Sequence, residues 1–289
     1  MSITGQKGQR LTPRELPTRG EFNGRSVIAD FPPRDSTRWH PGDQVPSNSG
    51  SRGGAVTLDM DGLVRAGRIV PPHVGSPQAE VFRHMKRQLL KNARSKESAV
   101  KRLSLIMVTS SLPREGKTFC AINLALSMAA EIDTSVLLVD ADVVRPSVMK
   151  RLGIHAGKGL LDVLTEPDLD LADVILQTNV PKLSILPAGT RNIMSTELLA
   201  SAAMESLLMS LATSQPDRVV ILDAPPLLVT NEANVLASRV GQILLIVEAT
   251  RTPRNAVGQA LATIEQCPIV MSVLNKAHES TLPYGYGYS

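Results

Sequence analysis

The sequence predicts an α/β fold in which a mainly parallel β-sheet is flanked by helices, with a disordered basic segment in front of it. Two observations support this fold class. Short apolar runs rich in β-branched residues alternate with longer segments of helical periodicity, as in βαβ units. In addition, the segment 111–118, which ends in Gly116-Lys117-Thr118, joins the first apolar run to a helical segment, and this is the pattern of the phosphate-binding loop in P-loop NTPase folds.

Hydrophobic periodicity sets the expected elements of this sheet. The expected strands are 104–110, 136–141, 183–187, 219–223, 242–248 and 270–274. The expected helices are 117–131, 196–213, 231–239 and 253–266. Pro253 is acceptable in the first turn of the last helix, because the first turn does not use the backbone N–H that proline lacks. Residues 101–278 are therefore predicted to form one nucleotide-binding domain.

The first 54 residues have a different composition. They are rich in Pro, Gly, Ser and Arg and contain the loop-like string 47–54. Such a composition buries too little apolar surface to offset its ordering entropy, so 1–54 is predicted to be disordered or a linker. Residues 1–100 carry 16 Lys and Arg against 9 Asp and Glu, so the front of the chain is basic. A basic front suits an anionic membrane surface or an acidic protein face, and without interleaved aromatic residues no nucleic acid is expected.

Residues 55–100 are expected to dock on the domain. Residues 58–65 have the pattern of one short amphipathic turn. From Ser76 a helical pattern begins, with basic residues between apolar positions near the 3.6 period, which are Val81, Phe82, Met85, Leu89 and Leu90. This pattern predicts an amphipathic helix in front of the nucleotide-binding domain.

The cysteines and the lengths of the apolar runs indicate the cellular compartment of the protein. Cys120 and Cys267 fall inside expected core elements without metal-ligand spacing, which favours a reducing compartment, the cytoplasm. The start has no signal-peptide pattern, and no run approaches the ~18 apolar residues that a membrane helix needs. A role at a membrane would therefore depend on a partner.

The loop Ser111-Leu112-Pro113-Arg114-Glu115-Gly116-Lys117-Thr118 has the residues of a phosphate cradle. Gly116 permits close backbone approach, Lys117 is expected to reach the β- and γ-phosphates of ATP, and the Thr118 hydroxyl is expected to bind Mg²⁺. Ser111 departs from the pattern, which has glycine there. The predicted nucleotide contacts of this segment are Ser111, Glu115, Gly116, Lys117, Thr118 and Phe119.

Carboxylates follow two further strands. Val136–Val139 runs into Asp140 and Asp142, and Val219–Leu222 runs into Asp223. Ligands of open α/β sheets bind at the carboxyl ends of parallel strands, where these acids are able to hold Mg²⁺ directly or through water. The alternative is that Asp140 and Asp142 only cap or turn the chain. Arg145 is suited to pair with a phosphate or with a carboxylate, and the sequence does not choose.

The tail, residues 279–289, holds all three tyrosines of the chain, Tyr284, Tyr286 and Tyr288. The glycines between them favour flexibility, and chain ends are usually exposed, so an active site is able to reach these phenols. Two interpretations are open, a phosphoacceptor cluster and a merely sticky or disordered terminus.

Residues 55–289 resemble the bacterial tyrosine kinases of polysaccharide export, and more narrowly the cytoplasmic autokinases of exosortase-type exopolysaccharide systems. Residues 111–118 match the Walker A motif of that family, Asp140-Ala141-Asp142 its second acidic box, and Asp223-Ala224-Pro225 its Walker B motif. Val144 departs from a position that is often basic in the family, which leaves Arg145 as the basic residue of that box.

The resemblance also implies contacts outside the phosphate site. A family oligomerisation helix has the pattern Glu-x-x-Arg-x-x-Arg, which Glu80, Arg83 and Lys86 match except for lysine at the last position. Lysine loses the bidentate fork of arginine, and solvated helix charges are the alternative interpretation. Asn275 resembles an adenine-side residue of related nucleotide sites.

The implied activity is transfer of the γ-phosphoryl group of ATP to tail tyrosines of a neighbouring subunit. Lys117 and Mg²⁺ would spread the developing charge, Asp140 would accept the phenol proton, and Asp142 and Asp223 would orient the metal. The resemblance further implies a homo-oligomer and an integral-membrane chain-length determinant that activates the kinase and recruits it from the cytoplasm to the inner membrane.

Two other functions remain open at this point. A partitioning or positioning ATPase has a related fold but carries a signature lysine five residues before the P-loop lysine, where this chain has Leu112. A non-catalytic nucleotide-binding assembly regulator is the other, and the intact set of Lys117, Thr118 and three acids argues against it. Phosphotyrosine mass spectrometry on the purified protein separates these functions.

Overall fold

The computed structural model describes residues 54–71, 75–95, 102–155, 157–213 and 215–277, together with the backbone of 26–28. The tail 279–289, with its three tyrosines, lies outside the described residues, as does most of the predicted linker 1–54. In the described part of the chain, no helix is both long enough and apolar enough to cross a membrane.

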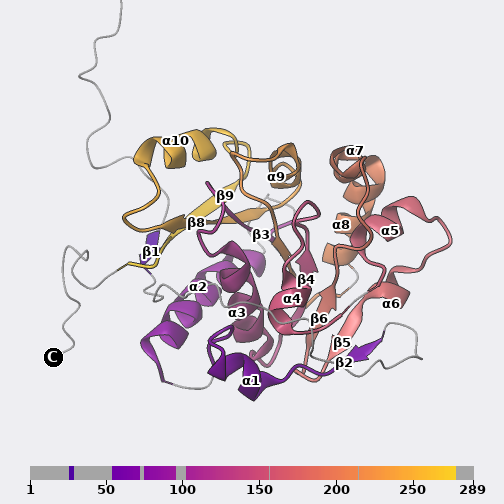
Figure 1. The fold of residues 1–289 in the computed structure, drawn as a ribbon, viewed down its shortest axis with the longest axis horizontal. Helices are drawn as coiled ribbons and strands as arrows, with labels where there is room; N and C mark the ends of the chain where they lie inside the picture. The colour runs from indigo at the N-terminus through magenta and orange to yellow at the C-terminus, as the bar shows by residue number, and fades with distance from the viewer. Residues whose placement is uncertain are drawn as a thin grey trace, which may run out of the picture.

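The described residues form one nine-stranded sheet in the order β1-β9-β8-β3-β7-β4-β6-β5-β2 (Figure 1). All neighbouring strands pair in parallel except β5 with β6. The strands are β1 Ser26–Ile28, β2 Ala55–Val56, β3 Leu105–Ser110, β4 Ser135–Asp140, β5 Leu176–Thr178, β6 Leu183–Leu186, β7 Arg218–Asp223, β8 Gln242–Glu248 and β9 Ile269–Asn275. The predicted fold class is confirmed.

Helices cover both faces of the sheet (Figure 1). One face packs against α1 Met60–Arg65, α2 Pro77–Ala93, α3 Lys117–Ala129 and α4 Val148–Leu152. The other packs against α5 Leu160–Thr165, α7 Ser195–Ala200, α8 Ala202–Thr213, α9 Asn231–Ala237 and α10 Arg254–Ala262, while the short α6 Leu171–Val174 precedes β5. Successive strand residues enter the two cores alternately, so the central strands are apolar on both sides, as parallel sheets require.

The six expected strands lie within one residue of their predicted ends, and 242–248 coincides with β8. The expected helix 196–213 is divided instead into α7 and α8. Ser201 causes the break, because its backbone is extended and its hydroxyl accepts a hydrogen bond from the Met204 N–H at 3.2 Å as an N-cap. The short elements β2, β5 and α4–α6 were not predicted, and β1 forms inside the segment predicted to be disordered.

Residues 55–95 dock on the domain as the apolar pattern indicates. The amphipathic turn 58–65 is present as α1, with Leu58 and Leu63 buried. The α2 helix begins at Pro77, where the Ser76 hydroxyl accepts a hydrogen bond from the Ala79 N–H at 3.1 Å. Its apolar face is buried against α3, so this front helix is part of the core rather than a separate appendage.

The charged residues of α2 differ in their surroundings. Glu80 and Arg83 form an exposed ion pair with each other one helical turn apart. Lys86 is buried: its Nζ donates to the Ser127 carbonyl oxygen at 3.0 Å and lies 2.6 Å from a carboxylate oxygen of Glu131, both near the end of α3. The hydrogen bond from Lys86 is the main reason that the pKa of Glu131 is below its usual value. An oligomer contact through Glu80 and Arg83 stays a prediction, whereas Lys86 is used within the subunit.

Lys86→Ala is therefore expected to reduce the free energy of unfolding by about 1–3 kcal/mol, because it removes a charged hydrogen-bond donor from a buried carbonyl and a carboxylate. Lys91→Ala, an exposed lysine on the same helix, is the control and is expected to change it by less than about 0.5 kcal/mol. Urea unfolding measures both. Equal effects of the two variants would contradict the structural role given to Lys86.

Candidate functional site

The loop after β3 places the backbone of the phosphate cradle. Gly116 ends the loop with a φ of 103°, in the left-handed region that favours glycine. A Cβ atom on this residue would lie 2.2 Å from the side-chain Nδ2 of Asn275, so any other residue here would have to displace the Asn275 side chain from its hydrogen bond with the Glu115 carbonyl oxygen. The α3 helix begins at the next residue, Lys117, and its positive end faces the loop.

The loop is fixed by side chains from distant parts of the chain. The Glu115 carboxylate accepts a hydrogen bond from the Leu112 N–H at 2.7 Å, and its other oxygen accepts one from the Thr252 hydroxyl. Asn275 donates from Nδ2 to the Glu115 carbonyl oxygen at 2.8 Å. Both side chains thus hold the loop in shape. Direct nucleotide contact by Glu115 and an adenine-side role of Asn275 stay predictions.

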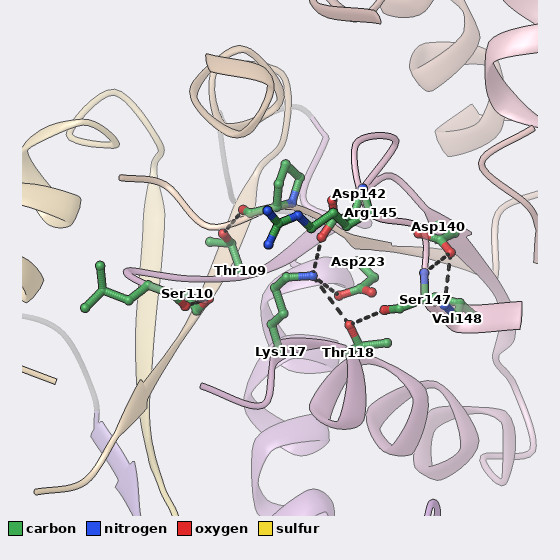
Figure 2. Close-up of polar contacts among 12 residues, drawn as sticks. Thr109, Ser110, Lys117, Thr118, Asp140, Asp142, Arg145, Ser147, Val148 and Asp223 are labelled. Carbon is green, nitrogen blue, oxygen red and sulfur yellow. Dashed lines mark hydrogen bonds and ion pairs between the residues drawn. The ribbon is translucent and has the colours of Figure 1, made fainter. Parts of the chain in front are cut away.

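Lys117 lies between two carboxylates (Figure 2). Its Nζ is 2.6 Å from Oδ2 of Asp142 and 3.7 Å from Oδ1 of Asp223. Burial disfavours the charged ammonium, but the charges of Asp223 and Asp142 outweigh burial and raise the pKa of Lys117. The side chain is therefore a positive charge held at the base of the loop, in position for an anion.

Asp223 is fully buried, and neither of its carboxylate oxygens has a hydrogen-bond partner among the described residues. Burial is the main reason that its pKa is raised, and the charge of Lys117 opposes this shift. Buried polar atoms without partners are rare in folded proteins and indicate a missing ligand, here a cation or a proton.

Asp140 lies beside Asp223, since the two residues are direct partners in the β4–β7 register. Its Oδ2 accepts hydrogen bonds from the N–H groups of Ser147 and Val148, both at 3.0 Å, and its Oδ1 has no partner among the described residues. Burial and the negative charge of Asp223 raise the pKa of Asp140 to about 7, against the lowering effect of the Val148 N–H. A carboxyl with a pKa near neutrality is suited to exchange a proton at physiological pH.

Ser147 is a site residue that the sequence did not single out. Its hydroxyl lies 3.0 Å from the Thr118 hydroxyl, while its N–H binds Asp140, so it connects the start of α3 to the end of β4 (Figure 2). The sequence feature that could have identified Ser147 is its position directly before the helical residues 148–152, where serine is a typical N-cap.

The structure brings Lys117, Thr118, Asp140, Asp142 and Asp223 together at the carboxyl edge of the sheet (Figure 2). Ser111 is in the same loop, and its buried hydroxyl has no hydrogen-bond partner among the described residues. By contrast, Phe119 packs against Phe82 on α2, with 6.3 Å between the ring centroids. Arg145 is exposed, and its N–H donates to Asp142 at 3.0 Å. The tail tyrosines lie outside the described residues.

The residues of the site fit a magnesium ion bound with a nucleotide. Mg²⁺ in such sites takes one or two protein oxygens, while phosphates and water complete the shell. Thr118, Asp142 and Asp223 supply a hydroxyl and carboxylates close to the loop, and the unpartnered oxygens of Asp223 are suited to a cation or its water. Within the described residues no cluster of three or more His, Cys, Asp or Glu side chains is arranged to hold a metal by itself.

A family model described as an AAA domain matches residues 106–275, which run from the first central strand to the end of β9. Among characterised proteins, the tyrosine-protein kinase CpsD of Streptococcus agalactiae is 34% identical over 188 residues, which are 63% of this chain and 80% of that protein. The succinoglycan biosynthesis transport protein ExoP of Rhizobium meliloti is 31% identical over 294 residues, which are 98% of this chain but 36% of that protein.

Among solved structures, the kinase domain of the Escherichia coli tyrosine kinase ETK is similar, with a TM-score of 0.64 and 26% identity. The similarity covers 76% of this chain and 86% of that domain. The matched region contains the loop and all three acids described above, because they lie within residues 106–275.

The raised pKa of Asp140 predicts how stability depends on pH. Between the ordinary value of 3.8 and about 7, the folded protein keeps a proton that the unfolded chain releases, so the free energy of unfolding falls as the pH rises through this window. The contribution of Asp140 to the slope of the unfolding free energy against pH is up to about 1.4 kcal/mol per pH unit, and Asp140→Asn should remove this contribution. Urea unfolding of nucleotide-free protein at several pH values from 4.5 to 7.5 measures the slope.

The matched control is Asp133→Asn, an exposed acid in the turn before β4, which is expected to keep the wild-type slope. Asp223 contributes in the same direction as Asp140, so the slope of Asp140→Asn should be reduced rather than abolished. An unchanged slope in Asp140→Asn would mean that Asp140 is ionised throughout this pH range.

Proposed function

The chain belongs to the family of bacterial tyrosine kinases and is a protein-tyrosine kinase, and we propose that it is an ATP-dependent autokinase that regulates exopolysaccharide polymerisation or export. The observation that carries this proposal is the position of Lys117 between Asp142 and Asp223, beneath a phosphate-binding loop. A relative that acts in succinoglycan biosynthesis supports the link to polysaccharides. A capsule or exopolysaccharide system is thus the proposed setting.

The nucleotide would be held by charge and by backbone groups. Lys117 can turn from Asp142 to the β- and γ-phosphates without leaving the pocket, because its ammonium already lies at the base of the loop. Thr118, Asp142 and Asp223 are the residues that would hold Mg²⁺, which supplies neutralisation of the phosphate charge. When Lys117 turns to the phosphates, the carboxylates of Asp142 and Asp223 become available to the metal ion.

The proton of the tyrosine acceptor needs a base near the phosphate. Asp140 is our candidate, because its pKa of about 7 allows it to accept a proton at neutral pH and its Oδ1 has no partner in the described part of the chain. Ser147 and Val148 bind the other oxygen and fix the direction of the carboxylate. These two N–H groups are thus positioning groups for the base.

The proposed acceptors are Tyr284, Tyr286 and Tyr288, which are all the tyrosines in the sequence. The last described residue, Ala277, follows the end of β9 at the same sheet edge as the nucleotide loop, because Asn275 binds Glu115 there. A tail that starts at this edge is able to enter the site of a neighbouring subunit. We therefore propose transfer in trans within a homo-oligomer.

Recruitment to a membrane would require another protein. We propose an integral-membrane chain-length determinant that docks on the kinase at the cytoplasmic side of the inner membrane and activates it. The exposed pair Glu80 and Arg83 on α2 is our candidate for the contact between kinase subunits, and it leaves Lys86 out.

Lys117→Met is expected to reduce tyrosine phosphorylation at least about 10²- to 10³-fold, because the charge that meets the transferred phosphate is lost. Incorporation of labelled phosphate from ATP measures the rate. Lys150→Met, which replaces an exposed lysine on α4, is the control and should keep the wild-type rate.

A second variant, Lys117→Arg, separates the effect of charge from that of geometry. Arginine keeps a cation between the carboxylates and should therefore keep the melting temperature, but this variant should also lose activity. A rate for Lys117→Met within tenfold of wild type would contradict the role of this loop.

Replacing Tyr284, Tyr286 and Tyr288 by Phe is expected to remove autophosphorylation and leave ATP binding unchanged, because phenylalanine keeps the ring and lacks only the acceptor hydroxyl. Transfer in trans is tested by mixing Lys117→Met protein, which retains its tyrosines, with active protein that carries the three Phe changes. The inactive chain should acquire phosphotyrosine, measured by mass spectrometry. An unlabelled inactive chain in mixed assemblies shown to form would exclude transfer in trans.

A further inference from the structure

A concave site lies against the phosphate-binding loop, and four residues of the loop line it. This cavity has a volume of about 320 Å³, at the lower end of the range for ligand pockets. It is lined by Leu112, Pro113, Arg114, Glu115, Glu248, Arg251 and Thr252. None of Lys117, Thr118, Asp140, Asp142 and Asp223 contributes to it. The cavity is therefore separate from the proposed catalytic groups, although the loop forms one of its walls.

The charges in this cavity favour an anion. The carboxylate of Glu115 is already hydrogen-bonded to Leu112 and Thr252, and that of Glu248 lies 3.1 Å from Nζ of Lys276. Arg114 is exposed, and its side chain makes no hydrogen bond or ion pair with any residue that the structure describes. Arg251 pairs with Glu248, with 3.8 Å between Nη1 and Oε1, and its side chain is 67% exposed. The guanidinium group of Arg114 thus has no partner among the described residues, and that of Arg251 stays largely exposed beside a carboxylate that Lys276 also neutralises.

Part of the lining of this cavity is apolar. Leu112 and Pro113 form this apolar wall. An aromatic ring packs well against such a wall and against the face of a guanidinium group, and a phosphate pairs with arginine in bidentate geometry. A ring that carries a phosphate, as in phosphotyrosine, combines both features. A free nucleotide phosphate or an acidic side chain would use the arginines but leave the apolar wall without a partner.

The tail of the chain begins beside this cavity. Nζ of Lys276 donates to the Arg114 carbonyl oxygen at 2.9 Å and pairs with Glu248, so the end of β9 touches two lining residues. The next residue, Ala277, is the last one described, and Tyr284 follows seven residues later. Seven residues span up to about 25 Å. A tether of this length gives an effective concentration in the millimolar range if the cavity lies within its reach.

We propose that this cavity binds a phosphotyrosine of the chain's own tail, with Arg114 and Arg251 binding the phosphate and Leu112 and Pro113 packing against the ring. The proposal rests on the proposed function in one respect, namely that the tail tyrosines become phosphorylated. Its consequence is regulatory: the bound phosphotyrosine contacts the loop that ends in Gly116 and Lys117, so the modification state of the tail acts directly on the nucleotide site.

The test uses the full chain with Tyr284, Tyr286 and Tyr288 replaced by Phe, and a synthetic peptide of residues 278–289 with phosphate on one tyrosine. The phosphopeptide is expected to bind at least about tenfold more tightly than the unmodified peptide in a fluorescence anisotropy titration, because the phosphate adds charge-assisted hydrogen bonds. Arg114→Gln and Arg251→Gln should each remove most of this difference. Arg65→Gln, an exposed arginine on α1 that does not line the cavity, should retain it.

Three results would overturn the proposal. The first is equal affinity for the two peptides, and the second is an unchanged difference in both arginine variants of the cavity. The third is competition, in which a non-hydrolysable ATP analogue with Mg²⁺ raises the phosphopeptide Kd in proportion to its concentration, since this would place the phosphate in the nucleotide site. The phosphate is introduced by synthesis, so this test does not depend on kinase activity. If the proposed kinase function were wrong, this would appear instead in the two phosphorylation experiments above, with Lys117→Met and with the three Tyr→Phe changes.

Docking within the same subunit is tested with a semisynthetic chain that carries one phosphotyrosine in its own tail. At concentrations where sizing shows a monomer, this chain should bind added phosphopeptide at least about tenfold more weakly than the chain with an unmodified tail, because its own tail occupies the cavity. Equal affinity of the two chains would overturn docking within the subunit.

Discussion

The contact on which the site depends is the buried ion cluster of Lys117 with Asp142 and Asp223. Burial of charges costs free energy unless partners compensate, and here one ammonium faces more than one carboxylate. The imbalance is relieved in part by protons, as the raised pKa values of Asp140 and Asp223 indicate. Excess buried negative charge is unfavourable by itself and becomes favourable when a cation enters. For the metal–nucleotide complex that we propose, the cost in stability of these buried charges is thus a source of binding free energy.

The parallel sheet is what makes such a cluster possible. The strand order β3-β7-β4 places the nucleotide loop and both acidic strands next to each other, and the register sets Asp140 directly opposite Asp223. Because apolar cores cover both faces, the strands have little freedom to move apart and release the repulsion between the two acids. The acids are thus held where a phosphate and its counter-ion can use them, which is preorganisation rather than adjustment on binding.

The sequence was sufficient for features that depend on local pattern. Strand ends, the loop from Ser111 to Thr118 and the acids that follow two strands are all visible in periodicity and spacing, and the fold places them where parallel strands end. The features it did not reveal depend on contacts between distant residues. Glu115 pairs with Thr252 across 137 positions, and Lys86 turns inward to α3 although its helix pattern reads as basic and solvated. Periodicity identifies which face of an element is buried but not which polar side chain it meets there.

These distant contacts converge on the nucleotide loop from one direction. Thr252 binds Glu115, Asn275 binds the Glu115 carbonyl oxygen, and Lys276 binds the Arg114 carbonyl oxygen, so the loop is held from outside by the ends of β8 and β9. Gly116 is part of this arrangement, because the absence of a Cβ atom leaves the space in which the Asn275 side chain reaches the Glu115 carbonyl oxygen. The chain continues from β9 into the tyrosine tail. A change in the tail therefore needs to move only Asn275 and Lys276, which lie at most four residues before it, to alter the loop that positions Lys117.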